Sequence, residues 1–170
     1  LKNLQSFGQT VVIAFNKFAT DTDEEIDVLR KHCEEMGCGF AVNSAFAEGG
    51  KGAMELAELV VKTIDEHPSA PLYFTYDDDE PVEKKIEDVA FNLYGAGSVT
   101  LSDSAKAMIE EIKKLGAEKF PICIAKTQYS FSTDAKAYGP TEGFELHVRD
   151  ITVNMGAEMI VVIAGPIMRM

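Results

Sequence analysis

One apolar run leads into a polar loop and then into a helix start, and this order constrains the fold more than any other stretch. Residues 11–15 contain no polar side chain, which is typical of a strand buried on both faces of a parallel sheet. Thr22 then predicts a helix N-cap, and Glu25 follows three residues later, as in a capping box. Residues 16–22 are therefore expected at the carboxyl end of a strand, where open α/β sheets bind ligands.

The same alternation of strand and helix continues through the first 70 residues. We expect a helix over 23–36, a strand over 40–46 and a helix over 53–66, with a glycine loop before the last helix. The helical spacing of its apolar residues predicts a buried face, made of Met54, Ala57, Val60, Val61 and Ile64. This order is that of a doubly wound parallel sheet.

Residues 71–170 have a different pattern, which begins after Pro68, Ser69 and Pro71. We expect strands over 72–76, 99–101, 121–125 and 159–164, and helices that begin near Pro81 and Ser102. Apolar and polar residues alternate over 144–155 with a slip of phase near Asp150, which predicts a β-bulge. The sequence thus predicts an α/β fold: residues 1–70 form part of a doubly wound parallel sheet, and residues 71–170 form a smaller α+β region.

Charge and composition exclude several classes of protein. The 170 residues carry a formal net charge of −12, which argues against nucleic-acid and anionic membrane partners. No apolar run approaches the roughly 18 residues of a membrane span, so we expect no transmembrane segment, and the first residues do not lead us to expect a signal peptide. Cys33, Cys38 and Cys123 are an odd number of cysteines in apolar surroundings, so we expect reduced core thiols in a cytoplasmic protein and no metal site.

Two aromatic residues follow the first two predicted strands in polar surroundings. Phe18 and Phe46 either fold back on the core, which the residue pattern alone favours, or flank one cleft at the end of a shared sheet. Two rings across a cleft can stack on a flat heteroaromatic ligand. Asp21 and Asp23 are interpreted first as partners of the helix dipole.

Two further segments are candidates for anion binding. Gly49 and Gly50 precede a helix, so their backbone N–H groups could hold an anion, although the loop lacks the pattern of a phosphate-binding P-loop. Lys126 follows the predicted strand 121–125 and could bind a phosphate or carboxylate with Thr127, Gln128 and Ser130. The alternative, a polar loop with a structural lysine, is favoured by chemistry alone.

Several of these segments together resemble one known family, formate–tetrahydrofolate ligase. The matching segments read VIAFNKFATDT (12–22), SAFAEGGKG (44–52), LAE (56–58), AKTQYS (125–130), GF (143–144), VRD (148–150) and GPIM (165–168). They keep the family's order and approximate spacing over nearly the whole chain. The chain is therefore identified as resembling the C-terminal portion of this enzyme.

The resemblance implies an activity and a site. The family joins formate to tetrahydrofolate through formyl phosphate, with ATP and Mg²⁺, and it acts as a homotetramer on small-molecule substrates. Phe18 would stack on the folate pterin ring, and Thr20, Asp21 and Thr22 would line the same cleft. Phe46 stands where the family has a tryptophan, so the second stacking ring is smaller and lacks the indole N–H.

The family's ATP-binding glycine loop and its formyl phosphate arginine lie upstream of the matching region. We therefore expect a chain truncated at both ends, which is inactive in isolation, and no catalytic residue is assigned within it. Formation of ADP that depends on formate would contradict this expectation. The alternative function is a non-catalytic pterin-binding or interaction module derived from the ligase.

Overall fold

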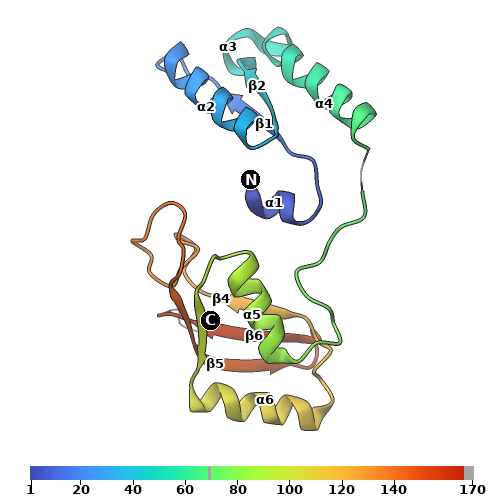
Figure 1. Cartoon of the computed structure of the whole chain (residues 1–170), viewed down its shortest axis with the longest axis vertical. Helices are drawn as coiled ribbons and strands as arrows, with labels where there is room; N and C mark the ends of the chain where they lie inside the picture. Colours follow the sequence, from blue (N-terminus) through green and yellow to red (C-terminus); the bar gives the residue numbers. More distant parts are fainter. Residues whose placement is uncertain (69, 167–170) are drawn as a thin grey trace. The chain divides into compact units, whose positions relative to one another are not determined.

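The computed structural model describes residues 1–68 and 70–166, which form two compact units. The first unit is Leu1–Tyr73 and the second is Phe74–Met170 (Figure 1). Ser69 lies outside the described residues, as do Ile167 and Met168 of the last family motif. Each unit is described by itself below.

The first unit contains a parallel pair of strands with a helix on each face (Figure 1). Its elements are α1 (Lys2–Ser6), β1 (Val12–Asn16), α2 (Asp23–Glu35), β2 (Gly39–Asn43), α3 (Ala45–Glu48), the 3₁₀ helix η1 (Gly49–Ala53) and α4 (Met54–Glu66). β1 and β2 run in register from Val12 opposite Gly39 to Asn16 opposite Asn43. The predicted parallel pairing of these two strands is confirmed.

Different residues cover the two faces of this strand pair. Ile26 and Cys33 of α2 pack with Phe40 against one face. On the other face Gly39 lies under α4, because a Cβ atom on Gly39 would lie 3.3 Å from the Leu59 side chain. The capping box of α2 is confirmed, since the Thr22 hydroxyl accepts from the Glu25 N–H and the Glu25 carboxylate accepts from the Thr22 N–H.

Three local predictions for the first unit are wrong. No residue of β1 is buried, although we expected burial on both faces, because each strand of a two-stranded sheet has a free edge. The second strand ends at Asn43, so that Phe46 lies in α3. The face of α4 that we predicted to be buried is exposed, and no residue of α4 is buried, because two strands are too narrow to cover it.

The second unit contains a four-stranded mixed sheet in the order β3-β5-β6-β4. Its elements are α5 (Val82–Asn92), β3 (Ser98–Leu101), α6 (Asp103–Leu115), β4 (Ile122–Ala125), β5 (Glu145–Asn154) and β6 (Met159–Ala164). β3 and β5 are parallel, as are β4 and β6, and β5 is antiparallel to β6. The strand pairing shifts between Val148 and Asp150, which confirms the predicted bulge.

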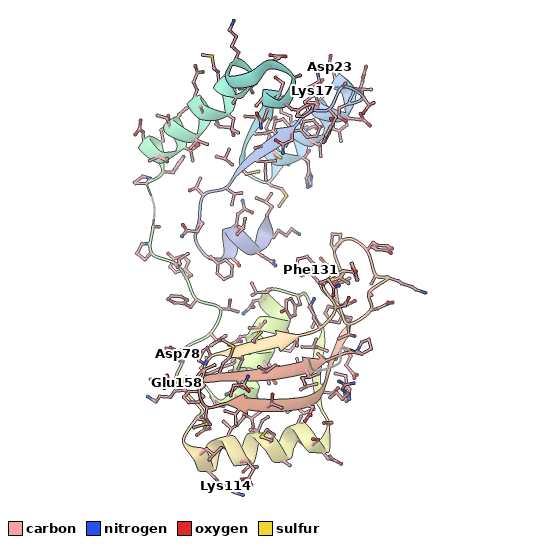
Figure 2. All side chains as sticks on the ribbon, turned by 180° about the vertical axis from the view of Figure 1, so that it is seen from behind. Lys17, Asp23, Asp78, Lys114, Phe131 and Glu158 are labelled. Carbon is pink, nitrogen blue, oxygen red and sulfur yellow. The ribbon has the colours of Figure 1, made fainter. Side chains whose placement is uncertain are left out.

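Both helices of the second unit pack on one face of its sheet. Ile86 of α5 and Ile109 of α6 belong to one buried cluster with Leu146, Ile151 and Val162 of the sheet. Figure 2 shows the opposite face, over which the described residues place no helix. Mixed strand pairing with helices on one face gives the second unit an α+β arrangement, whereas the strand pair of the first unit is parallel.

Two predictions near the second unit are wrong. Residues 72–76 form a loop instead of the predicted strand, because no neighbouring strand in the described part of the chain completes their backbone hydrogen bonds. Their hydrogen bonds are isolated: the Tyr73 N–H donates to Phe7 O, and the Tyr76 hydroxyl accepts from the Ile122 N–H. Cys123 is exposed on the uncovered side of β4, whereas Cys33 is buried and Cys38 half-buried. Among the described residues, no helix combines the length and apolar character that a bilayer span requires.

Candidate functional site

The loops after β1 and β2 leave the first sheet at the same edge. The two strands are parallel and in register, and their last residues, Asn16 and Asn43, face each other. Phe18 lies two residues beyond the first strand, and Phe46 lies three residues beyond the second. The carboxyl ends of neighbouring parallel strands are where open α/β sheets bind ligands, and a shared ligand for the two rings stays a prediction.

A tight turn fixes the backbone at Phe18. The Phe18 N–H donates to the Asp21 carboxylate at 2.7 Å, and the Asp21 N–H donates back to Phe18 O at 3.1 Å. Lys17 and Asp23 form an ion pair of 3.2 Å beside this turn, and Figure 2 shows the two side chains at the same end of the unit. These two hydrogen bonds close the turn, while Phe18 remains 68% exposed.

The second loop is folded as closely as the first. The Ser44 N–H donates to Gly52 O at 3.0 Å, which closes the segment that contains α3. A Cβ atom on Gly52 would lie 2.5 Å from the Ser44 carbonyl carbon, so only glycine fits at this approach. Phe46 projects from this closed segment and its side chain is 100% exposed.

Exposure separates the two interpretations of these aromatic residues. A phenylalanine that folds back on the core loses most of its accessible surface, yet Phe18 and Phe46 both keep most of theirs. Large exposed apolar side chains that lie at one end of a sheet are typical of a binding surface. Within the first unit, the exposure therefore favours a role in contact with a ligand or another surface.

The remaining residues predicted for this cleft have different surroundings. Thr20 is exposed in the turn, whereas the Thr22 hydroxyl is engaged by Glu25 in the capping box. The hydrogen bonds from Thr22 hold the pKa of the Glu25 carboxyl below its ordinary value. Asp21 also lines an open groove of about 540 Å³ beside α2, whose other lining residues are Phe15, Glu24, Glu25, Val28 and Leu29.

Gly49 and Gly50 lie where α3 passes into η1. The Gly49 N–H donates to Ala45 O as the C-terminal cap of α3, so this group is engaged within the loop. Gly49 has φ 62° and ψ −147°, a conformation that essentially only glycine adopts. The conformation of the turn thus accounts for this glycine, and anion binding by the two residues stays a prediction.

Lys126 belongs to the second unit and follows β4, as predicted. Its ammonium group donates to Thr127 O at 3.3 Å and to Ser130 O. It also lies 4.6 Å from the Tyr94 ring centroid and 5.8 Å from that of Phe131. Burial lowers the pKa of Lys126, and the two carbonyls and two ring faces surround its charge.

The loop around Lys126 also encloses a hollow of about 380 Å³. Its lining includes Tyr94, Thr127, Gln128, Ser130 and Phe131. Thr127 is buried and its hydroxyl accepts from the Tyr129 N–H, so part of the predicted anion-binding set maintains the loop itself. Burial, with the nearby Cys123 thiol as a lesser cause, raises the pKa of Tyr94. These contacts favour a structural role for Lys126, and its role as an anion ligand stays a prediction.

Sequence reasoning missed two polar residues of the first unit. Asn16 and Asn43 end the two strands, and the Asn43 side-chain amide donates to the Asn16 side-chain oxygen at 2.8 Å. The available signal was an asparagine directly after each apolar run.

Among the described residues no group of three His, Cys, Asp or Glu side chains is arranged to hold a metal ion.

Comparison with known proteins gives one consistent result. A family model described as formate–tetrahydrofolate ligase matches residues 1–170. Proteins named formate–tetrahydrofolate ligase match the whole chain with 60% identity in Bacteroides fragilis, 62% in Phocaeicola vulgatus and 48% in Campylobacter concisus. The chain spans 31% of the length of each of these curated relatives.

Proposed function

Because this chain belongs to the formate–tetrahydrofolate ligase family, we propose that it provides the pterin-binding wall of a ligase that makes 10-formyltetrahydrofolate. The substrates would be formate, tetrahydrofolate and ATP, and formyl phosphate would be the intermediate. The loops after β1 and β2, within residues 1–70, would contact the pterin ring. The observation that carries the proposal is the exposure of Phe18 and Phe46 at the carboxyl ends of two adjacent parallel strands.

The chemistry of the two loops suits a flat and neutral ring. Phe18 and Phe46 provide apolar faces that can stack on a pterin from loops that backbone hydrogen bonds hold in place. Asp21 and Thr20 add oxygen acceptors beside Phe18, where the pterin's N–H groups need partners. In this role the chain's residues bind and orient tetrahydrofolate, while phosphoryl transfer depends on groups that we assign to no residue here.

The remaining properties of the enzyme are proposed from its family. ATP would bind as its Mg²⁺ complex, but the described residues show no cluster suited to the metal, so we derive no step through it. We propose that the ligase is a cytoplasmic homotetramer. The isolated 170-residue chain is expected to form no ADP when formate is added.

Calorimetric titration of this chain with tetrahydrofolate tests the proposed site. Phe18→Ala and Phe46→Ala should each weaken binding by about tenfold, because an aromatic ring stacked on a nucleobase-like ring contributes about 1–3 kcal/mol. Phe46→Trp should tighten binding, since the indole ring offers a larger face than phenylalanine. Tyr138→Ala is the matched control, because Tyr138 is an 81% exposed aromatic residue of the second unit with no proposed role.

Each result of the titration has a definite meaning. Weaker binding in both phenylalanine variants, with Tyr138→Ala unchanged, supports the stacking assignment. Binding that is unaffected by both substitutions overturns that assignment. If a polypeptide of the relatives' full length binds tetrahydrofolate but forms no ADP when formate is added, the non-catalytic module is favoured.

A further inference from the structure

One asparagine contacts both loops that carry the exposed aromatic residues. The backbone oxygen of Asn43 accepts from the Lys17 N–H at 3.0 Å, directly before Phe18. The side-chain oxygen of Asn43 accepts from the Ala45 N–H at 3.2 Å, directly before Phe46. Asn43 thus contacts the residue that precedes each ring.

The side chain of Asn43 also joins the two strand ends. Its amide nitrogen donates to the Asn16 side-chain oxygen at 2.8 Å. The Ala45 N–H can only donate, so the atom that faces it must be the Asn43 oxygen, and the nitrogen must face Asn16. The hydrogen-bond network therefore fixes the orientation of the Asn43 side-chain amide. The Asn16–Asn43 bond needs one donor and one acceptor, which the two side chains supply between them.

We propose that Asn43, paired with Asn16, is a positioning residue that holds the Phe18 and Phe46 loops at the spacing that tetrahydrofolate requires. This inference rests on the proposed function. Each loop has its own internal restraint, the Asp21 carboxylate at Phe18 and the Gly52 carbonyl at Ser44. These restraints shape each loop separately, whereas the Asn16–Asn43 bond connects them.

The connection predicts an unusual response to substitution. Asn43→Asp keeps the oxygen that faces Ala45, and the Asn16 amide can rotate to donate to the new carboxylate. Asn16→Asp keeps the oxygen that accepts from Asn43. The double variant N16D/N43D has no donor and places two carboxylates together, so the bond is lost only when both residues change.

Two measurements test this response. Each single variant should bind tetrahydrofolate within about threefold of the unsubstituted chain, and the double variant should bind about tenfold more weakly, since paired residues show non-additive effects. Hydrogen exchange of the Lys17 and Ala45 amides, followed by NMR without ligand, should accelerate mainly in the double variant, because repulsion between the two carboxylates separates the strand ends and draws both acceptors of residue 43 away. The amide of fully buried Ala41 should keep its exchange rate, which separates loop release from global unfolding.

The outcomes separate the two proposals. Non-additive effects on both exchange and binding support the positioning role. Additive effects, or coupled exchange with unchanged affinity in a chain that binds tetrahydrofolate, overturn it. A chain that does not bind tetrahydrofolate overturns the proposed function, and the exchange data then decide by themselves whether the asparagine pair holds the two loops.

Discussion

The two units of this chain bury their apolar side chains to very different extents. In the second unit, α5 and α6 cover one face of a four-stranded sheet and enclose a continuous buried cluster. In the first unit, the buried cluster contains Ile26, Cys33 and Phe40, and α4 has no buried residue. The second unit therefore has a core of its own, whereas the first unit carries the candidate ligand loops on a narrow sheet.

This difference shows that helix pattern and helix burial are separate properties. α4 and α6 are both 13-residue helices with an apolar face. α6 buries Ala105, Ile109 and Ile112, because four strands present a wide apolar surface. The apolar face of α4 has no comparable surface within this unit, so Val61 and Ile64 remain exposed.

The largest effect should follow from a cavity in the second unit. Ile109→Ala should lower the free energy of unfolding by about 2–5 kcal/mol, because Ile109 is fully enclosed between α6 and the sheet. Ile64→Ala on α4 is the matched control and should change stability by less than about 0.5 kcal/mol. Urea unfolding followed by circular dichroism measures both variants, and similar losses would contradict the comparison.

A buried lysine provides the next test. Lys85 is fully buried, and its ammonium group donates to Glu118 O at 2.8 Å and to Phe120 O at 3.3 Å. Lys85→Met should lower the free energy of unfolding by about 2 kcal/mol, because both carbonyls lose a buried donor. Equal stability of the two chains at neutral pH would contradict this role.

The same residue predicts a pH dependence. Burial lowers the pKa of Lys85, and the carboxylates of residues 77–80 oppose this effect only in part. Since the unfolded chain then binds the proton more tightly, stability rises with pH between the lowered pKa and the ordinary lysine value of about 10.4. The stability difference between the unsubstituted chain and Lys85→Met should therefore widen in alkaline urea titrations, and an unchanged difference would contradict it.

Helix caps offer a smaller and matched comparison. Ser102→Ala removes the hydroxyl that accepts from the Ala105 N–H at 3.1 Å, and it should cost about 1 kcal/mol in the second unit. Thr22→Ala removes the corresponding cap of α2, and residue-resolved hydrogen exchange should locate its loss in the first unit. Unchanged exchange of the α2 amides in Thr22→Ala, or of the α6 amides in Ser102→Ala, would contradict the capping roles.

Acid titration tests the same α2 cap. The pKa of Glu25 is lowered in the folded chain, so its contribution is present above the ordinary glutamate value of about 4.3 and is lost as the pH falls through the lowered value. Thr22→Ala should remove this part of the acid dependence, as followed by exchange of the α2 amides. Identical acid profiles would contradict the capping role of the carboxylate.

The smallest effect is expected on the outer face of α4. Val61→Lys should change the free energy of unfolding by less than about 0.5 kcal/mol, because this side chain is 60% exposed. Ile112→Lys on α6 is the opposite case, since it would place an unpaired charge among buried residues. Thermal unfolding of the two variants gives the sharpest single comparison of the two units.

Local patterns were sufficient for much of the fold. The α2 capping box and the bulge near Asp150 follow from spacing over a few residues, and the parallel pairing of the first two strands follows from the order strand, helix, strand. The prediction for residues 72–76 failed because an apolar run forms a strand only where a neighbouring strand completes its hydrogen bonds. The prediction of a buried face on α4 was wrong for a related reason, since periodicity identifies an apolar face but not the element that covers it.

The sequence by itself determined the alternation of strand and helix in the first unit and the position of Phe18 just beyond the first strand. It could do so because capping, periodicity and turn chemistry act between residues that are close in the chain. The tertiary structure alone decided that Asn43 bonds to Asn16, which is 27 residues away, and that Tyr94 and Phe131 enclose Lys126. Contacts between distant residues depend on how whole elements pack, and no short stretch of sequence contains that information.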